Sequence, residues 1–158
     1  MIIIGIDPGL DGAIVVIQKG TQQILKHWIM PTIPGKRREY DVPSIVRIFE
    51  EIKQLDSEMM VHLEKPGKFS KGILAVASTS FCSGMLQGVL VSLRIPYKLV
   101  RAQEWQKQVL KGLSMDTKQA SILWATRKYP EFDFRRSERC RTAYDGLCDA
   151  LGLAHYTS

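Results

Sequence analysis

The segment that most constrains the fold of this chain is its first seven residues, MIIIGID. They form an almost continuous apolar run that ends on a carboxylate, Asp7. Such a run is typical of a central strand that is buried on both faces. Residues 8–12, PGLDG, have the composition of a turn. We therefore expect a buried strand at the centre of a sheet, with an acid and a turn at its end.

The pattern along the rest of the chain predicts three strands in a meander, followed by alternating helices and strands. The predicted strands span residues 1–7, 13–18, 22–30, 59–64 and 96–101. The predicted helices span residues 42–55, 73–93, 103–111, 117–128 and 141–156, and residues 31–40 are expected to form a polar, basic loop. Asp41 is placed to cap the first of these helices.

This order predicts an α/β fold with a five-stranded mixed sheet and helices on both faces. The first three strands would be antiparallel, and the later ones would join in parallel through right-handed crossovers. The order resembles the ribonuclease H-like topology. The 158 residues contain no repeat and no linker-like segment, so we expect a single domain.

Composition narrows the function further. The net charge of +6 favours a polyanionic partner. Three cysteines, Cys82, Cys140 and Cys148, have no CxxC spacing, so we expect reduced thiols rather than a disulfide framework or a zinc site. We expect no signal peptide and no membrane span. A span needs roughly 18 to 20 apolar residues, and we expect no stretch of the chain to reach that length.

Four carboxylates stand out by their positions. Asp7 and Glu64 each end an apolar strand, and Asp145 and Asp149 are four residues apart on the last helix, so they share one face. Carboxylates in apolar settings are rare unless they are paired or coordinated. Oxygen ligands without histidine or thiolate neighbours select magnesium or manganese. Three of these acids also have an ordinary interpretation: Asp7 as a turn residue, Glu64 as a partner of Lys65, and Asp149 as a surface acid.

Several motifs resemble the RuvC-type family of Holliday junction resolvases, within the ribonuclease H-like superfamily. The matching segments are IGIDPGLDGA (4–13), HLEKP (62–66), EWQK (104–107), the lysine-bearing 116–118 and YDGLCDALGLAHY (144–156). Residues 132–151 most resemble the plastid-type and phage or bacterial branch of crossover junction endodeoxyribonucleases. The bacterial pattern places its last two acids three residues apart, whereas Asp145 and Asp149 are four apart, a spacing that the plastid-type branch shares. The resemblance covers nearly the whole chain.

The resemblance implies a dimeric nuclease that cuts four-way DNA junctions by two-metal-ion hydrolysis with Mg²⁺, for which Mn²⁺ would substitute. Asp7 would bridge both ions, Glu64 would hold one, and Asp145 with Asp149 would hold the other. Lys118 would stabilise charge on the phosphate or orient the water. Its alternative is a solvated lysine in a helix capped by Asp116. The dimer would form through the helix over residues 73–93.

Basic and aromatic residues near these acids are candidates for DNA contacts. One set, in the loop after Glu64, would wedge or stack at an opened junction, and another immediately precedes the last helix. The candidates are Lys65, Lys68, Phe69, Lys71, Gln87, Lys107, Arg135, Arg136, Arg139 and Arg141. A second basic cluster at residues 36–38 has the alternative of a solvated face, and Phe69 that of packing on the core. Trp105 and Trp124 are interpreted as core residues.

Two other classes of function remain open at this point. One is another ribonuclease H-like nuclease that acts on RNA or linear DNA. The other is a non-catalytic junction-binding module whose acids hold only a structural ion. No small-molecule cofactor is expected. The compartment would be the bacterial or phage-infected cytoplasm or nucleoid, or the chloroplast stroma for a mature plastid protein.

Overall fold

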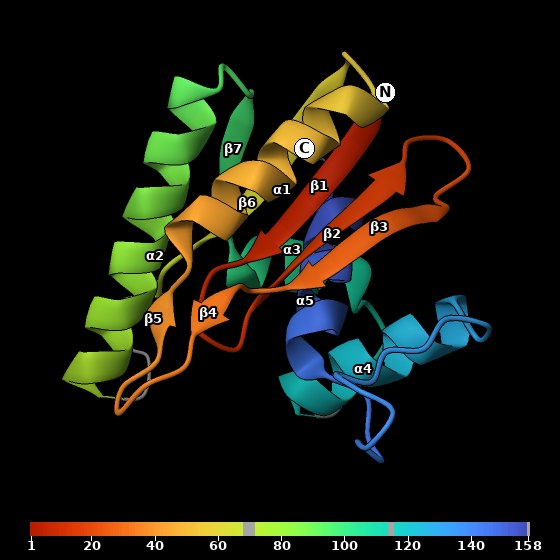
Figure 1. Cartoon of the computed structure of the whole chain (residues 1–158). Coiled ribbons are helices and arrows are strands. Elements are labelled where there is room, and N and C mark those ends of the chain that lie inside the picture. Colours follow the sequence, from red (N-terminus) through yellow and green to blue (C-terminus); the bar gives the residue numbers. More distant parts are fainter. Residues whose placement is uncertain (68–71, 114–115, 158) are drawn as a thin grey trace.

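A five-stranded sheet forms the centre of the computed structural model, which describes residues 1–67, 72–113 and 116–157 (Figure 1). Its strand order is β3-β2-β1-β6-β7. The strands are β1 (Ile2–Asp7), β2 (Ala13–Gln18), β3 (Ile24–Ile29), β6 (Met59–Lys65) and β7 (Tyr97–Arg101). β1 pairs antiparallel with β2 and parallel with β6, and β7 continues in parallel beyond β6. The predicted mixed sheet, with its first three strands antiparallel, is therefore confirmed.

Helices cover both faces of the sheet, as the continuous apolar strand at its centre requires. α1 (Val42–Leu55) and α2 (Ile73–Ser92) pack on one face, where their side chains meet Ile2, Ile4 and Ile6 of β1. The other face carries α5 (Asp145–His155), and α3 (Ala102–Val109) and α4 (Thr117–Lys128) lie on the outer side of α5 (Figure 1). The alternate residues of β1 thus point into two separate cores.

Helix α5 lies unusually close to the central strand. A Cβ atom at Gly5 of β1 would stand 1.9 Å from the carbonyl oxygen of Ala150 in α5. On its outer side, a Cβ at Gly152 would stand 2.5 Å from the ring of Trp105. The two glycines let the helix fit between β1 and α3, and this contact fixes the helix relative to the end of β1.

Two sequence-based expectations about local structure are wrong. The segment 31–40 is not only a loop, because β4 (Thr32–Ile33) and β5 (Glu39–Tyr40) form a short antiparallel hairpin. The last helix begins at Asp145 rather than at residue 141, because Ala143 is bridged to Arg135 instead. Asp41 caps α1 as predicted, since its carboxylate accepts from the Ser44 backbone amide at 3.1 Å.

The surface of α2 is apolar and carries no charged residue. Its side chains Ile73, Leu74, Phe81 and Val91 are 87%, 80%, 62% and 61% exposed. With 20 residues and a mean hydropathy of 1.5, α2 is long and apolar enough to cross a membrane, so the expectation that no stretch reaches this length is wrong. One such helix is weak evidence for a span, because core helices of soluble proteins meet the same criteria.

Candidate active site

The site begins at the edge of the sheet where two neighbouring strands end. Asp7 is the last residue of β1, and Glu64 is the next-to-last residue of β6. The parallel pairing sets Ile6 opposite Leu63, so the two acids follow at the next position of the register. The carboxyl ends of two adjacent parallel strands therefore supply two acids to one point.

Helix α5 supplies the other two acids. Asp145 is its first residue and Asp149 lies one turn later, so both are on the same face. The close fit of α5 against Gly5 brings this first turn beside the end of β1. From α4, the ammonium Nζ of Lys118 contacts Oδ2 of Asp145 at 2.5 Å. The structure thus gathers the five predicted catalytic residues from four elements.

The pKa values show that these carboxylates act on one another. Burial raises the pKa of Asp7 well above its ordinary value, and the charges of Glu64, Asp149 and Asp145 raise it further. Burial, followed by Glu64 and Asp145, raises the pKa of Asp149 to about 7. The Lys118 ammonium lowers both pKa values but does not cancel the rise. A bound cation would offset the burial and the mutual repulsion that raise these pKa values.

The chemistry of the donor set fits a hard divalent cation. Oxygen Oδ1 of Asp149 is buried and has no hydrogen-bond partner among the described residues, although all four acids keep part of their surface exposed. A buried carboxylate oxygen without a partner can be satisfied by a bound cation. Among the described residues, however, no three His, Cys, Asp or Glu side chains already stand close enough to hold an ion. A cation would have to draw the acids inward.

Comparison with solved structures identifies the architecture. No protein-family model and no curated protein sequence matches the chain. It is similar to Thermus thermophilus RuvC in complex with a Holliday junction substrate, with a TM-score of 0.69 and 18% identity over 98% of this chain and 90% of that one. A second T. thermophilus RuvC structure gives a TM-score of 0.64 and 20% identity, over 96% of this chain and 92% of that one. The chain has a RuvC-like fold. This finding confirms the predicted ribonuclease H-like architecture.

Within this RuvC-like fold, Trp105 is a site residue that the sequence did not reveal. Its indole Nε1 donates to Oε2 of Glu64 at 2.8 Å, and its ring is fully buried in α3. Burial raises the pKa of Glu64, and the bond from Trp105 lowers it. The sequence showed only an apolar residue at a helical position. The resemblance of the EWQK segment to the family motif was the strongest sequence signal for Trp105, but it did not indicate that Trp105 bonds to Glu64.

The candidate DNA-contacting residues are only partly brought together. Arg135, Arg136, Arg139 and Arg141 are exposed on the segment before α5, and Lys65 and Lys107 are exposed at the end of β6 and on α3. Arg135 is already engaged by Asp133, and Arg136 by Asp11. Gln87 is half-buried and bonds to Ser83 and Tyr97 within the fold. Lys68, Phe69 and Lys71 lie outside the described residues.

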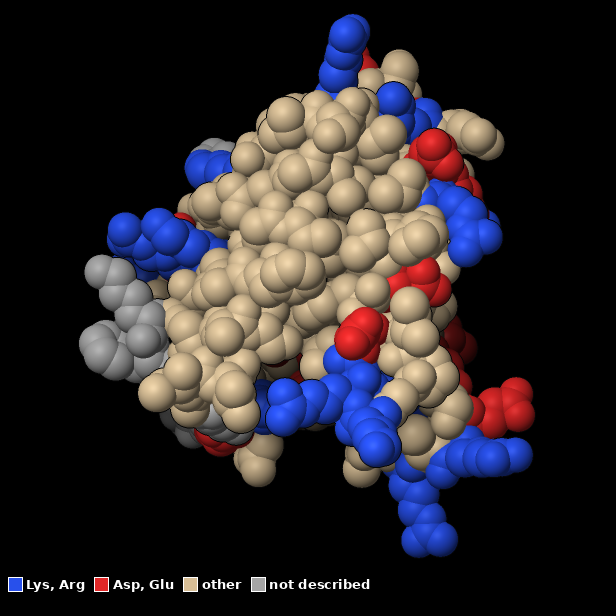
Figure 2. Space-filling view, turned by 60° about the vertical axis from the view of Figure 1, so that its left-hand side comes forward, with Lys and Arg blue, Asp and Glu red and all other residues tan. Residues whose placement is uncertain are grey.

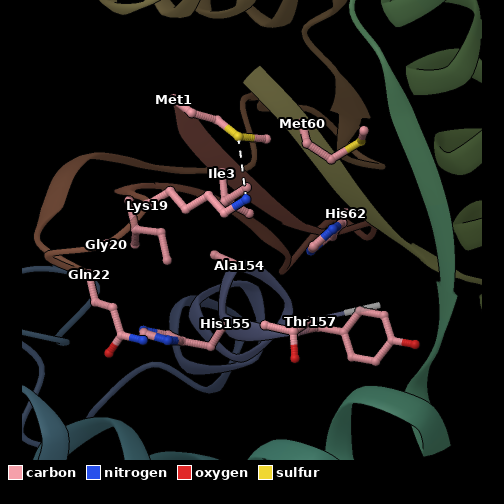
Figure 3. A pocket seen from close by; sticks show the side chains of 12 residues that line it. Met1, Ile3, Lys19, Gly20, Gln22, Met60, His62, Ala154, His155 and Thr157 are labelled. Atoms are coloured by element: carbon pink, nitrogen blue, oxygen red, sulfur yellow. Dashed lines mark hydrogen bonds between the residues drawn. The ribbon is translucent and has the colours of Figure 1, made fainter. Parts of the chain in front are cut away.

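A cavity of about 270 Å³ lies at the opposite end of the sheet from the acids, near the start of β1. Its floor includes Ile3 and Ala154, and Figure 3 shows Met1 and Lys19 facing His155 and Thr157 across it. Burial lowers the pKa of His155 to about 4, so that ring is neutral at neutral pH. This largely apolar cavity therefore lacks the carboxylate chemistry of the candidate site.

Proposed function

We propose that this chain is a metal-dependent endonuclease that resolves four-way (Holliday) DNA junctions by paired, symmetric nicks. The observation that carries the proposal is the meeting of Asp7, Glu64, Asp145 and Asp149 at one sheet edge of a RuvC-like fold, with Lys118 beside them. One structural neighbour is RuvC bound to a Holliday junction substrate, which supports the same class of substrate here.

Asp7, Glu64, Asp145 and Asp149 would together hold two Mg²⁺ ions, or Mn²⁺ in their place. When bound, such ions activate water for attack on a phosphodiester and stabilise the charge that develops on the phosphate. Glu64 would be held in place for this task by the indole of Trp105. Lys118, whose side chain is 60% exposed, would neutralise charge on a phosphate lying over the acids. Its present contact with Asp145 shows that it reaches this site.

We also propose that α2 joins two copies of the chain into a C2 dimer. Figure 2 brings the side of the molecule that holds α2 forward, and this face is largely free of charged side chains. Gly84 and Gly88 are one helical turn apart and exposed, and a Cβ at either position would meet no atom within residues 1–67, 72–113 and 116–157. Small residues at this spacing permit close approach of a second helix. A dimer would provide one active site for each of the two strands to be cut.

The remaining parts of the proposal concern the DNA path and the origin of the chain. The basic residues before α5, together with Lys65 and Lys107, would bind the phosphate backbone. Lys68, Phe69 and Lys71, which lie outside the described residues, and Gln87 are further candidates for contacts at an opened junction. The four-residue spacing of Asp145 and Asp149 favours the plastid-type or phage-like branch. The protein would then act in the bacterial or phage-infected cytoplasm or nucleoid, or in the chloroplast stroma.

The experiment compares substrates that contain the same sequences. An immobile four-way junction, a matched duplex, a single strand and an RNA–DNA hybrid are incubated with the chain in Mg²⁺, and the cut positions are mapped. We expect symmetric nicks in two opposing strands of the junction and little cleavage of the others. Preferred cleavage of the hybrid or the duplex would instead indicate another ribonuclease H-like nuclease. Binding of the junction without any cleavage would indicate a non-catalytic module.

A further inference from the structure

One carboxylate beside the candidate active site holds two arginines that come from distant parts of the chain. Asp11, in the turn after β1, pairs with Arg38 of the β4–β5 hairpin through two parallel contacts, Nη1–Oδ1 at 2.8 Å and Nη2–Oδ2 at 3.1 Å. The same Oδ1 accepts from Nη1 of Arg136 at 3.4 Å. Arg136 belongs to the segment before α5. Asp11 therefore ties three segments together.

This arginine pair is anchored to the first turn of α5, where Asp145 lies. A Cβ at Gly146 would stand 2.4 Å from the backbone oxygen of Asp11, so the turn and the helix are in close contact. The guanidinium of Arg136 lies over the ring of Tyr144, 5.3 Å from its centroid. Tyr144 immediately precedes Asp145. The position of both guanidiniums is thus fixed relative to the acids.

Both arginines keep the capacity to bind an anion. The side chains of Arg38 and Arg136 are 37% and 42% exposed, and two guanidiniums against one carboxylate leave one net positive charge. A guanidinium has five N–H donors. Arg38 donates two hydrogen bonds to Asp11 and one to the Leu10 carbonyl, and Arg136 donates one to Asp11. The remaining donors suit the oxygens of a phosphate.

We propose that Asp11 is a positioning residue for DNA, which fixes Arg38 and Arg136 so that both bind the phosphate backbone beside the four acids. The inference rests on the proposed function and adds Asp11 and Arg38 to it. Exposed ion pairs contribute little to stability, so the value of this network lies in restricting two long, flexible side chains before DNA arrives. Sequence reasoning assigned Asp11 only to a turn.

The sign of the effect separates this role from simple electrostatics. Replacing Asp11 by Asn removes a negative charge, which by itself strengthens attraction to DNA. Loss of positioning acts in the opposite direction, because the two arginines must then be ordered at the expense of binding free energy. A weaker complex in Asp11→Asn is therefore the distinguishing result.

The test measures junction binding in EDTA across a salt series, and single-turnover cleavage in Mg²⁺ with the protein in saturating excess. For Asp11→Asn we expect a Kd about five- to tenfold higher and a log–log salt dependence less steep by about one. The cleavage rate at saturation should stay within about twofold of wild type, and Asp11→Glu should recover part of the affinity. A thermal melt checks that each variant is folded.

Glu51→Gln is the matched control, since it breaks an exposed pair with Lys26 (3.1 Å) and makes the same change in net charge. We expect binding by this variant to be unchanged. In a background with Arg38→Gln and Arg136→Gln, the Asp11→Asn change should no longer weaken binding, because only its charge effect remains. Binding by Asp11→Asn that equals or exceeds wild type would overturn the positioning role. If the wild-type chain does not bind the junction, the proposed function itself fails, and the role of Asp11 fails with it.

Discussion

At the scale of single residues, the candidate site concentrates negative charge that the fold alone does not balance. Asp149 carries the clearest sign of this, with a pKa of about 7 and a buried oxygen that has no partner. The ammonium of Lys118 contacts Asp145 directly, and it lowers the pKa values of Asp7 and Asp149 only from a greater distance. The acids therefore cost stability in the absence of metal, as groups selected for chemistry often do.

The pH dependence of stability tests this imbalance. Because the pKa of Asp149 is higher in the folded chain than the ordinary 3.8, the folded state binds the proton more tightly than the unfolded state. The free energy of unfolding should then fall as pH rises from about 4 to about 7, by about 3 kcal/mol. Thermal or urea unfolding in EDTA measures it. Asp149→Asn should flatten the profile in this range, and a wild-type stability that rises with pH would contradict the assignment.

The indole of Trp105 gives a second prediction at this scale. Trp105→Phe removes the donor to Glu64 and leaves a small cavity, which should lower the free energy of unfolding by about 1–3 kcal/mol. The pKa of Glu64 should rise, so the acidic limb of the pH–rate profile should move to higher pH. Trp124→Phe is the control, since Trp124 packs edge-on against His155 instead. An unchanged pH–rate profile in Trp105→Phe would argue against this role.

At the scale of elements, the sequence predicted each strand of the main sheet and each helix in the part of the chain that the structure describes, and the apolar periodicity was clearest for α1. The β4–β5 hairpin was missed, since two-residue strands have no period to detect. The start of α5 was placed four residues early, because a backbone bridge between Arg135 and Ala143 leaves no mark in the residue types.

The residues of the candidate site likewise fall into those that the sequence pattern could predict and those that it could not. Acids that end apolar strands or share a helical face could be found from the sequence. Partners set by tertiary contact, such as Trp105 on Glu64 or Arg38 on Asp11, could not.

The fit between β1 and α5 is the element-scale feature on which the site depends most. Gly5→Ala would place a methyl group 1.9 Å from the Ala150 carbonyl oxygen, and backbone atoms cannot move aside as a side chain can. We expect a loss of about 3 kcal/mol or more in the free energy of unfolding. Gly67→Ala, where a Cβ meets no atom of the described residues, should change it by less than about 0.5 kcal/mol. Urea unfolding compares them, and similar values for both would refute the close packing.

At the scale of the whole molecule, the account requires two copies of the chain joined through α2. Leu74 and Phe81 are seven residues apart on one face of α2 and strongly exposed. Replacing both by Glu should convert a dimer into a monomer, because charges cannot be buried in an apolar interface without a partner. Sedimentation velocity at micromolar concentration measures this. The control variant, with Glu50→Ala and Glu51→Ala on α1, should remain a dimer. A monomeric wild-type protein would contradict the proposed assembly.

The proposed cleavage of a DNA junction depends on the four acids and a divalent metal. The most direct measurement is cleavage of a labelled immobile junction by wild type and Asp7→Asn in Mg²⁺, with junction binding measured in parallel. We expect paired nicks by wild type, no cleavage in EDTA, and a loss of at least about a hundredfold in rate for Asp7→Asn with junction binding retained. Full cleavage by Asp7→Asn, or by wild type in EDTA, would contradict this expectation.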